Sequence, residues 1–372
     1  MAAAIYEPTG GALSRTPILC KAEDAAIVLR FELSIKVWRG DVANVPASPS
    51  YELTKYPDQN NTATFDISQL LQGEFSSDYE TVFTEFTPNT GQVIWVECTY
   101  TIVGESTSQQ IVGTPFLVFN GYGEFSEGVN PISPLIASSQ SSNIFLNESS
   151  PYFLALSQIN LAFPVETVDV RFDIGGSQNY VNTNINLDLS QNNLLYMDIS
   201  PSLFAGLYDK GYEVVIEDTD GEEVARINVE VECEPKYTPA TIAFLNKNGA
   251  WDYLTFSKAM RESIQVESGE YTPYILDTTF GSAPSYNTFD AQTKKYDINA
   301  VQSVTFNTTF LPEPYFDTIK QLMMSSQCVW VENGLSVNPS TMNMSKKFSV
   351  NKEMVQYTVE FTHASLTQST VR

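Results

Sequence analysis

Apolar and polar residues alternate along most of this chain, and the alternation predicts one β-strand after another. Over residues 29–38, Leu, Phe, Leu, Ile and Val alternate with Arg, Glu, Ser and Lys, as in a strand with one buried face. Similar runs predict strands over 62–67, 93–103 and 110–119. A helical turn capped by Asp66 or Ser68 is expected at 66–71. Residues 1–119 are therefore expected to form an N-terminal arm and a β-sandwich.

The composition changes after this first segment. Residues 120–150 are rich in Gly, Pro, Ser and Asn, and we interpret them as a linker with an extended segment. Further strands are expected over 165–174, 183–189, 194–199 and 212–231. Asp220-Gly221 marks a hairpin between two alternating runs, because a type I′ turn needs positive φ at both central residues. A second β-sandwich is expected over 151–236.

The last segment, 237–372, adds a helix to the strands. Hairpin turns are expected at Asn248-Gly249 and Asn333-Gly334. After Pro314, apolar residues recur at three- and four-residue steps and predict a helix near 314–326. A final strand is expected over 354–361. The chain is thus predicted to be mainly β, with two antiparallel β-sandwich-like domains followed by a C-terminal α+β domain with one helix on an antiparallel sheet.

Size and charge limit the possible partners. At 372 residues the chain exceeds what one hydrophobic core usually organises, which agrees with several domains. The sequence carries 44 acidic and 20 basic residues, for a formal net charge of −24. This charge repels phosphate backbones and anionic lipids, so neither nucleic acid nor a membrane is expected as a partner. The charge fits either high solubility or a specific cationic partner.

Candidate chemistry is sparse in this sequence. His363 is the only histidine, and most proton transfer and transition-metal binding near neutral pH use imidazole. The four cysteines, Cys20, Cys98, Cys233 and Cys328, form no C-x-x-C pair and are expected to be reduced. No Gly-x-Ser-x-Gly motif, secretory signal or long apolar segment is present. We therefore assign no catalytic, cofactor-binding or metal-binding residue and expect no enzyme.

Several weaker patterns have two interpretations. Residues 218–223 resemble a calcium loop but lack the twelve-residue register, which favours a hairpin tip. Residues 121–125 resemble a nucleotide-binding loop only superficially, because the Lys-Ser/Thr pair is missing. Paired carboxylates of the glycosidase kind stay open, since such pairs meet only in space. Exposed Tyr and Trp could stack on sugars, although sheet cores and subunit contacts account for them better.

Two stretches carry a resemblance to a known family. The first is Phe119-Asn120-Gly121-Tyr122-Gly123-Glu124-Phe125-Ser126-Glu127-Gly128-Val129-Asn130-Pro131. The second is Glu232-Cys233-Glu234-Pro235-Lys236-Tyr237-Thr238-Pro239, followed by Phe244-Leu245-Asn246-Lys247-Asn248-Gly249-Ala250-Trp251 and Phe256. The first resembles the Gly-Tyr-x-x-Phe-x-Glu-Gly-x-Asn-Pro segment of virion proteins from tailed phages, especially those of Bacteroidetes and other aquatic bacteria. The second resembles their Glu-Cys-x-Tyr-x-Pro and Phe-x-Asn-(Lys/Arg)-x-Gly-Ala signature. One extra residue at 234–236 and Asn248 in place of an aromatic depart from the pattern.

The resemblance implies a structural protein of the phage particle, in the tail, the tail tip (baseplate) or a head-to-tail ring. Its partners would be copies of itself in a symmetric ring and neighbouring virion proteins. It would be made in the host cytoplasm and would reside in the virion, with no catalytic residue and no cofactor to carry over. The alternative is a glycan- or receptor-binding β-sandwich protein at a phage or cell surface, with an exposed row of Trp and Tyr on one sheet face.

Overall fold

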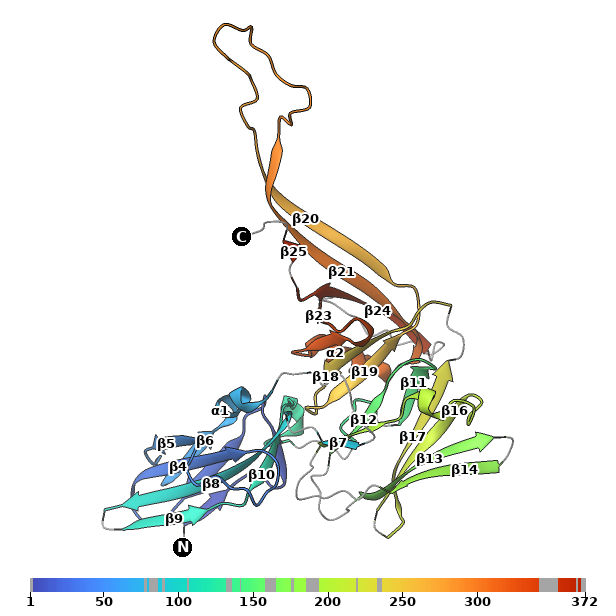
Figure 1. The fold of residues 1–372 in the computed structure, drawn as a ribbon. Helices are drawn as coiled ribbons and strands as arrows, with labels where there is room; N and C mark the ends of the chain where they lie inside the picture. Colours follow the sequence, from blue (N-terminus) through green and yellow to red (C-terminus); the bar gives the residue numbers. More distant parts are fainter. Residues whose placement is uncertain are drawn as a thin grey trace.

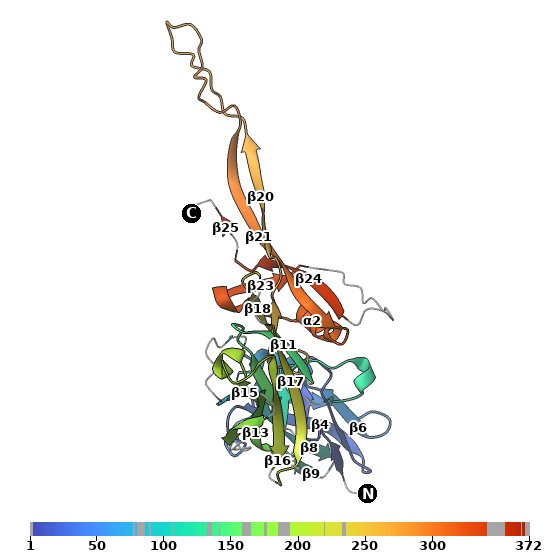
Figure 2. The same ribbon diagram turned by 90° about the vertical axis from the view of Figure 1, so that its right-hand side faces the viewer.

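The chain folds as three β-rich domains, and the first and second lie side by side beneath the third (Figures 1 and 2). The computed structural model describes residues 3–76, 79, 86–88, 91–105, 107–131, 136–140, 142–157, 165–174, 177–184, 194–218, 220–232, 236–340, 354–365 and 367–368. Within them, strands dominate and the α-helices are short, so the predicted mainly-β fold class is confirmed. No helix of the described part is long and apolar enough to cross a bilayer.

The first domain is a sandwich of a three-stranded and a six-stranded sheet. The small sheet has the order β1-β3-β6, with bounds Ala4–Tyr6, Leu19–Glu23 and Thr62–Asp66. The large sheet has the strand order β2-β10-β8-β4-β5, and β9 also pairs with β8. In that order the strands span Gly11–Leu13, Phe116–Phe119, Val93–Gly104, Val28–Trp38 and Tyr51–Lys55, and β9 spans Ser108–Val112. One apolar core joins the sheets and contains Cys20 and Phe65 from the small sheet with Leu33 and Val96 from the large one.

Three details of this domain differ from the sequence prediction. The strand expected over 110–119 is split into β9 and β10, because Pro115 lacks the N–H that a continuous ladder needs and the Gly113 N–H donates to the Cys98 carbonyl at 2.8 Å. The expected N-terminal arm lies in the sandwich, since β1 pairs with β3 and β2 with β10. The helical turn exists as α1 (Ser68–Leu71), followed by η1 (Gln72–Glu74), but its N-cap is Ile67.

The second domain packs a five-stranded sheet on a three-stranded one. The order β11-β17-β16-β13-β14 has the bounds Asn143–Asn147, Glu223–Glu232, Gly211–Asp218, Val165–Ile174 and Ser177–Asn184. The order β12-β15-β7 has the bounds Phe153–Ser157, Leu194–Asp198 and Phe86–Pro88, and η3 spans Pro201–Phe204. The hairpin at Asp220-Gly221 is confirmed, with Gly221 at φ 77°. Most of the strand expected over 183–189 lies outside the described residues.

The segment 120–150, expected as a linker, is in part a structural element of the folded domains. Strand β11 pairs parallel to β17, and its Ile144 and Leu146 are buried. A 3₁₀ turn, η2, spans Phe125–Glu127. Strand β7 likewise reaches from the first segment into the second domain. Turn-rich composition indicates loops, but it carries no information about such long-range pairing.

The third domain is an eight-stranded sheet that carries helix α2 (Tyr315–Met324). Its strand order is β19-β18-β22-β23-β24-β21-β20, and β25 also pairs with β21. In that order the strands span Trp251–Phe256, Ala240–Leu245, Cys328–Trp330, Leu335–Pro339, Met354–His363, Lys294–Pro312 and Arg261–Tyr271, and β25 spans Thr367–Gln368. The helix buries Tyr315, Ile319 and Leu322, as the spacing predicts. Both Asn-Gly hairpins are confirmed, the second through η4 (Val331–Asn333).

Candidate functional site

The two stretches that carry the resemblance meet where the first and third domains join. The Tyr122 N–H donates to the Lys247 carbonyl at 2.8 Å. A Cβ atom on Gly121 would lie 2.4 Å from that same carbonyl oxygen. Gly249 has φ 81°, and a Cβ atom there would lie 2.8 Å from the backbone nitrogen of Asn120. Only glycine fits at either position, so the 120–122 segment and the 247–249 turn are in direct backbone contact.

Ion pairs flank this joint on the side of α2. The Lys247 ammonium pairs with Glu127, and the Lys320 ammonium lies 2.6 Å from Glu124. The hydrogen bond from Lys320 lowers the pKa of Glu124. Partial burial raises the pKa of Glu127, but hydrogen bonds from Lys247 and from the Glu124 N–H outweigh it, so this pKa is also lowered. Both carboxylates therefore stabilise the joint in their ionised form.

Stability at this joint should depend on pH. A depressed carboxyl pKa adds stability above the unfolded-state pKa, about 4.5 for Glu, and this contribution disappears as the pH falls through the folded value. We expect E124Q/E127Q to unfold at a lower temperature than the unaltered chain at pH 7, with the difference shrinking as the pH falls below 4.5 and through the lowered pKa of the two carboxyl groups. Thermal melting between pH 7 and pH 3 measures this. The exposed Glu148→Gln is the control, and a pH-independent difference would contradict the assignment.

A buried polar cluster lies on the other side of the same hairpin. The Asp252 side chain is fully buried. Its carboxylate accepts hydrogen bonds from the Ser139 N–H at 2.5 Å, the Tyr152 hydroxyl at 3.2 Å, the Asn246 amide at 3.4 Å and the Tyr253 N–H at 2.9 Å. All four donors belong to the protein, and the carboxylate is screened from solvent. Asp252 therefore joins the domains and is not placed to act on a substrate.

The apolar core continues across the domain boundaries around this cluster. Trp251 is fully buried, its backbone N–H donates to the Tyr196 hydroxyl at 2.8 Å, and its ring meets that of Tyr79 edge-on at 5.0 Å. The same core cluster contains Phe119 from the first domain and Leu154 from the second. The three domains are thus held together by a shared apolar core.

Of the sequence features considered for chemistry that the structure describes, only Cys20 and Cys98 lie in contact with each other, as neighbouring thiols in the core of the first domain. His363 ends β24, is half-buried, and its ring lies 6.4 Å from that of Trp330. Glu223, in the calcium-like segment, is paired with Arg226 at 2.6 Å on an exposed hairpin. Cys20, Cys98 and Cys328 are buried free thiols, and Cys233 lies outside the described residues. In the described part of the chain, no group of three or more His, Cys, Asp and Glu side chains is arranged to hold a metal ion.

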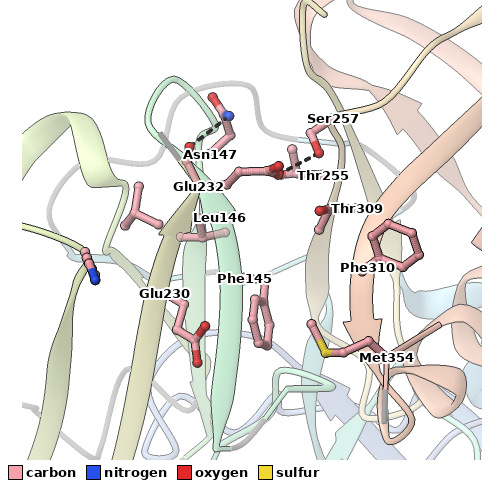
Figure 3. A pocket seen from close by; sticks show the side chains of 12 residues that line it. Phe145, Leu146, Asn147, Glu230, Glu232, Thr255, Ser257, Thr309, Phe310 and Met354 are labelled. Carbon is pink, nitrogen blue, oxygen red and sulfur yellow. Dashed lines mark hydrogen bonds between the residues drawn. The ribbon is translucent and has the colours of Figure 1, made fainter. Parts of the chain in front are cut away.

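A groove of about 360 Å³ lies between the second and third domains (Figure 3). Phe145, Phe310 and Met354 form its apolar side, and Phe310 is 57% exposed. On the polar side, the Glu232 carboxylate accepts hydrogen bonds from Ser257 and Lys258, each at 2.9 Å. Glu230 is the second acid that lines the groove, and the Glu232 carboxylate is engaged by its ion pair with Lys258.

The most exposed feature of the molecule is the hairpin β20–β21, which extends far beyond the rest of the fold (Figures 1 and 2). Every residue of β20 is exposed or half-buried, and β21 is its sole partner strand among the described strands. Large exposed apolar side chains gather on the hairpin and its loop: Ile264, Val266, Tyr271, Tyr274, Leu276, Phe280, Tyr286, Phe289 and Tyr296. Phe280 and Phe289 are almost wholly in solvent, at 102% and 94% exposure.

This hairpin was not among the elements expected from the sequence. The alternation of Ser263 to Glu267 and of Gln302 to Asn307 is the signal that could have found it. The long segment 272–293 between the strands hid their pairing, because no two-residue turn marks it. Ile264 and Val266 lie on the face that carries buried Val304, so the hairpin continues an apolar core face into solvent.

Tryptophan is not available for sugar stacking on a sheet face. Trp38, Trp251 and Trp330 are buried, and half-buried Trp95 stacks on Trp38 with ring centroids 6.4 Å apart. The exposed aromatic side chains are Tyr and Phe, and most of them lie on the projecting hairpin. This distribution gives no support to the exposed Trp and Tyr row expected of a glycan-binding sandwich.

No protein-family model matches this chain, and no curated protein matches it. Among solved structures it is similar to a tri-modular GH5 (subfamily 4) endo-β-1,4-glucanase from Bacillus licheniformis, with 12% identity, 62% of this chain and 38% of the glucanase covered, and a TM-score of 0.20. It is also similar to the fibronectin(III)-like modules of Clostridium thermocellum CbhA, with 10% identity, 63% of this chain and 97% of the CbhA chain covered, and a TM-score of 0.17. It is also similar to extracellular domains 3–5 of Drosophila OTK, with 13% identity, 80% of this chain and 90% of the OTK chain covered, and a TM-score of 0.20. Similarity this low gives no information on what this chain binds or does.

Proposed function

We propose that this chain is a structural subunit of a tailed bacteriophage particle, in the tail, the tail tip (baseplate) or a head-to-tail ring, and that it acts through protein–protein assembly. The observation that carries the proposal is the projecting β20–β21 hairpin with its exposed Ile, Val, Tyr and Phe side chains. Soluble monomers rarely expose contiguous apolar surface, and a long unprotected edge strand is a site for pairing with another chain. The phage context comes from the resemblance over 119–131 and 232–256.

The rigid body of the molecule supports an architectural role. The shared core and the backbone contact between 120–122 and 247–249 hold the domains together, and the core of the third domain buries Val304 and Phe306 at the base of the hairpin. A preorganised support lowers the entropic cost of binding, because few groups need to be ordered when the partner arrives.

Shortening the hairpin tests this proposal. Tyr271 and Lys294 are paired across the strands, so replacing 272–293 by Asn-Gly closes the hairpin with a two-residue turn. The loop side chains belong to none of the three core clusters, so the shortened chain should keep its melting temperature. Immunogold labelling should find the full chain in purified virions, and a phage supplied only with the shortened chain should yield few intact particles.

Three results would count against the proposal. These are absence of the chain from purified virions, normal particle yield with the shortened hairpin, or glycan-array binding by the intact chain that disappears on shortening. The last result would favour the glycan- or receptor-binding alternative. The control is the exposed β16–β17 turn, where substituting Asp220 and Glu222 by serine changes a second hairpin tip without touching β20 or β21.

A further inference from the structure

Strand β20 is an open edge. It ends the strand order of the third sheet, and β21 occupies one of its sides only. Within the described strands nothing pairs with its other side, so its outward N–H and C=O groups face solvent. Ile264 is 62% exposed and Val266 is 56% exposed, although both extend the core face of the sheet. An edge that combines free backbone groups with exposed apolar side chains is suited to strand addition.

Geometry restricts how two copies of this edge can pair. Two identical strands related by a two-fold axis run antiparallel, and directly opposite residues point to the same face of the sheet. Each residue therefore faces a residue of the second copy whose number has the same parity, odd with odd and even with even. The axis passes beside the one residue that faces its own copy. A bulge between Glu267 and Gly269 interrupts this parity, so the regular edge covers 261–267.

Charge then selects one register. Arg261 is the only basic residue of β20, and its acids are Glu262, Glu267 and Glu270. Glu262 has the wrong parity, and Glu270 lies beyond the bulge. Glu267 alone can face Arg261, and this requires the axis to pass at Ile264, midway between them. The same axis places Arg261 opposite Glu267 twice, once at each end of the paired segment, and Ile264 opposite its own copy.

We propose that β20 pairs with β20 of a second copy of this chain about a two-fold axis at Ile264. The inference rests on the proposed role in assembly and names the partner at the base of the hairpin. It joins the two eight-stranded sheets into one continuous sheet and, on the core face, places Ile264 against its own copy and Val266 against Glu262 of the second copy. Two Arg261–Glu267 pairs on the opposite face set the register and disfavour other alignments.

Charge reversal tests the register. In sedimentation or light scattering, R261E and E267R should each weaken the dimer by about tenfold or more, because two attractive pairs become repulsive. The double variant R261E/E267R exchanges the charges and should restore dimerisation. All these side chains are exposed, so circular dichroism should show an intact fold for each variant. If the single variants dimerise like the unaltered chain, or if the double variant stays monomeric, the register is wrong.

Cross-linking tests the axis directly. With a short bis-maleimide, Ile264→Cys should give a covalent dimer, because residue 264 faces itself. Glu262→Cys alone should give none, whereas a mixture of Glu262→Cys and Val266→Cys chains should cross-link. All chains carry Cys233→Ser, and this background alone is the control, since its remaining cysteines, Cys20, Cys98 and Cys328, are buried. Equal cross-linking at 262 and 264, or none at 264, would refute the pairing.

The two proposals can fail separately. A chain that is present in virions but not cross-linked at 264 would retain its assembly role through other surfaces. A chain that is cross-linked at 264 but absent from virions would retain the dimer and lose the phage assignment.

Discussion

Asp252→Ala should lower the free energy of unfolding by about 4 kcal/mol, because it removes the acceptor of several buried hydrogen bonds. The Ser139 N–H, the Tyr152 hydroxyl and the Asn246 amide would each keep their burial and lose a partner. Urea denaturation followed by tyrosine and tryptophan fluorescence measures the change. Asp252→Asn should cost less, since one acceptor oxygen is retained.

The matched control for this prediction is Asp290→Ala. Asp290 is exposed in the loop between β20 and β21, and its replacement should change stability by less than about 0.5 kcal/mol. A similar small change for Asp252→Ala would show that the buried carboxylate does not hold the domains together. A large change with an unaltered unfolding slope would place the loss in native-state stability.

Gly121→Ala should destabilise the chain by about 3 kcal/mol, with the loss concentrated at the joint between the first and third domains. The new Cβ atom would lie 2.4 Å from the Lys247 carbonyl oxygen, which belongs to backbone and cannot rotate away. The 120–122 segment would have to separate from the 247–249 turn, which breaks the Tyr122 to Lys247 hydrogen bond. Calorimetry together with limited proteolysis measures both stability and opening of the joint.

Gly73→Ala provides the control for this change. A Cβ atom on Gly73 would have no neighbouring atom within 4 Å, and this glycine has no positive φ, so alanine should be neutral or slightly stabilising there. If Gly121→Ala melts like Gly73→Ala, the backbone contact at the joint is looser than the structure indicates. New proteolytic cleavage confined to the joint would confirm that the domains separate before they unfold.

Local sequence signals predicted the strands that have one buried face and the turns that need positive φ. The runs around Leu33, Val96 and Val359 became strands with those side chains in the core, and Gly221, Gly249 and Gly334 all adopt positive φ. These features could be predicted because they depend only on residues a few positions apart in the sequence.

Features that depend on distant partners were not predictable in the same way. The parallel pairing of β11 with β17 and the placement of β7 beside β15 join segments far apart along the chain. The β20–β21 hairpin was missed although its strands alternate, because the long segment 272–293 separates them and no two-residue turn marks their pairing. The contact between Gly121 and Lys247 shows the reverse case: two stretches noted separately in the sequence proved to be one structural unit.

Strand β21 has a mechanical consequence. It runs without interruption from Lys294, at the foot of the loop, to Pro312, beside α2. A pull on the loop would act on both β20 and β21, and along β21 it would load the hydrogen bonds to β24 on each side of the Asn307–Phe310 bulge in shear, so that several of them must yield together. A force applied at the tip of the hairpin would therefore reach the sheet of the third domain through β21.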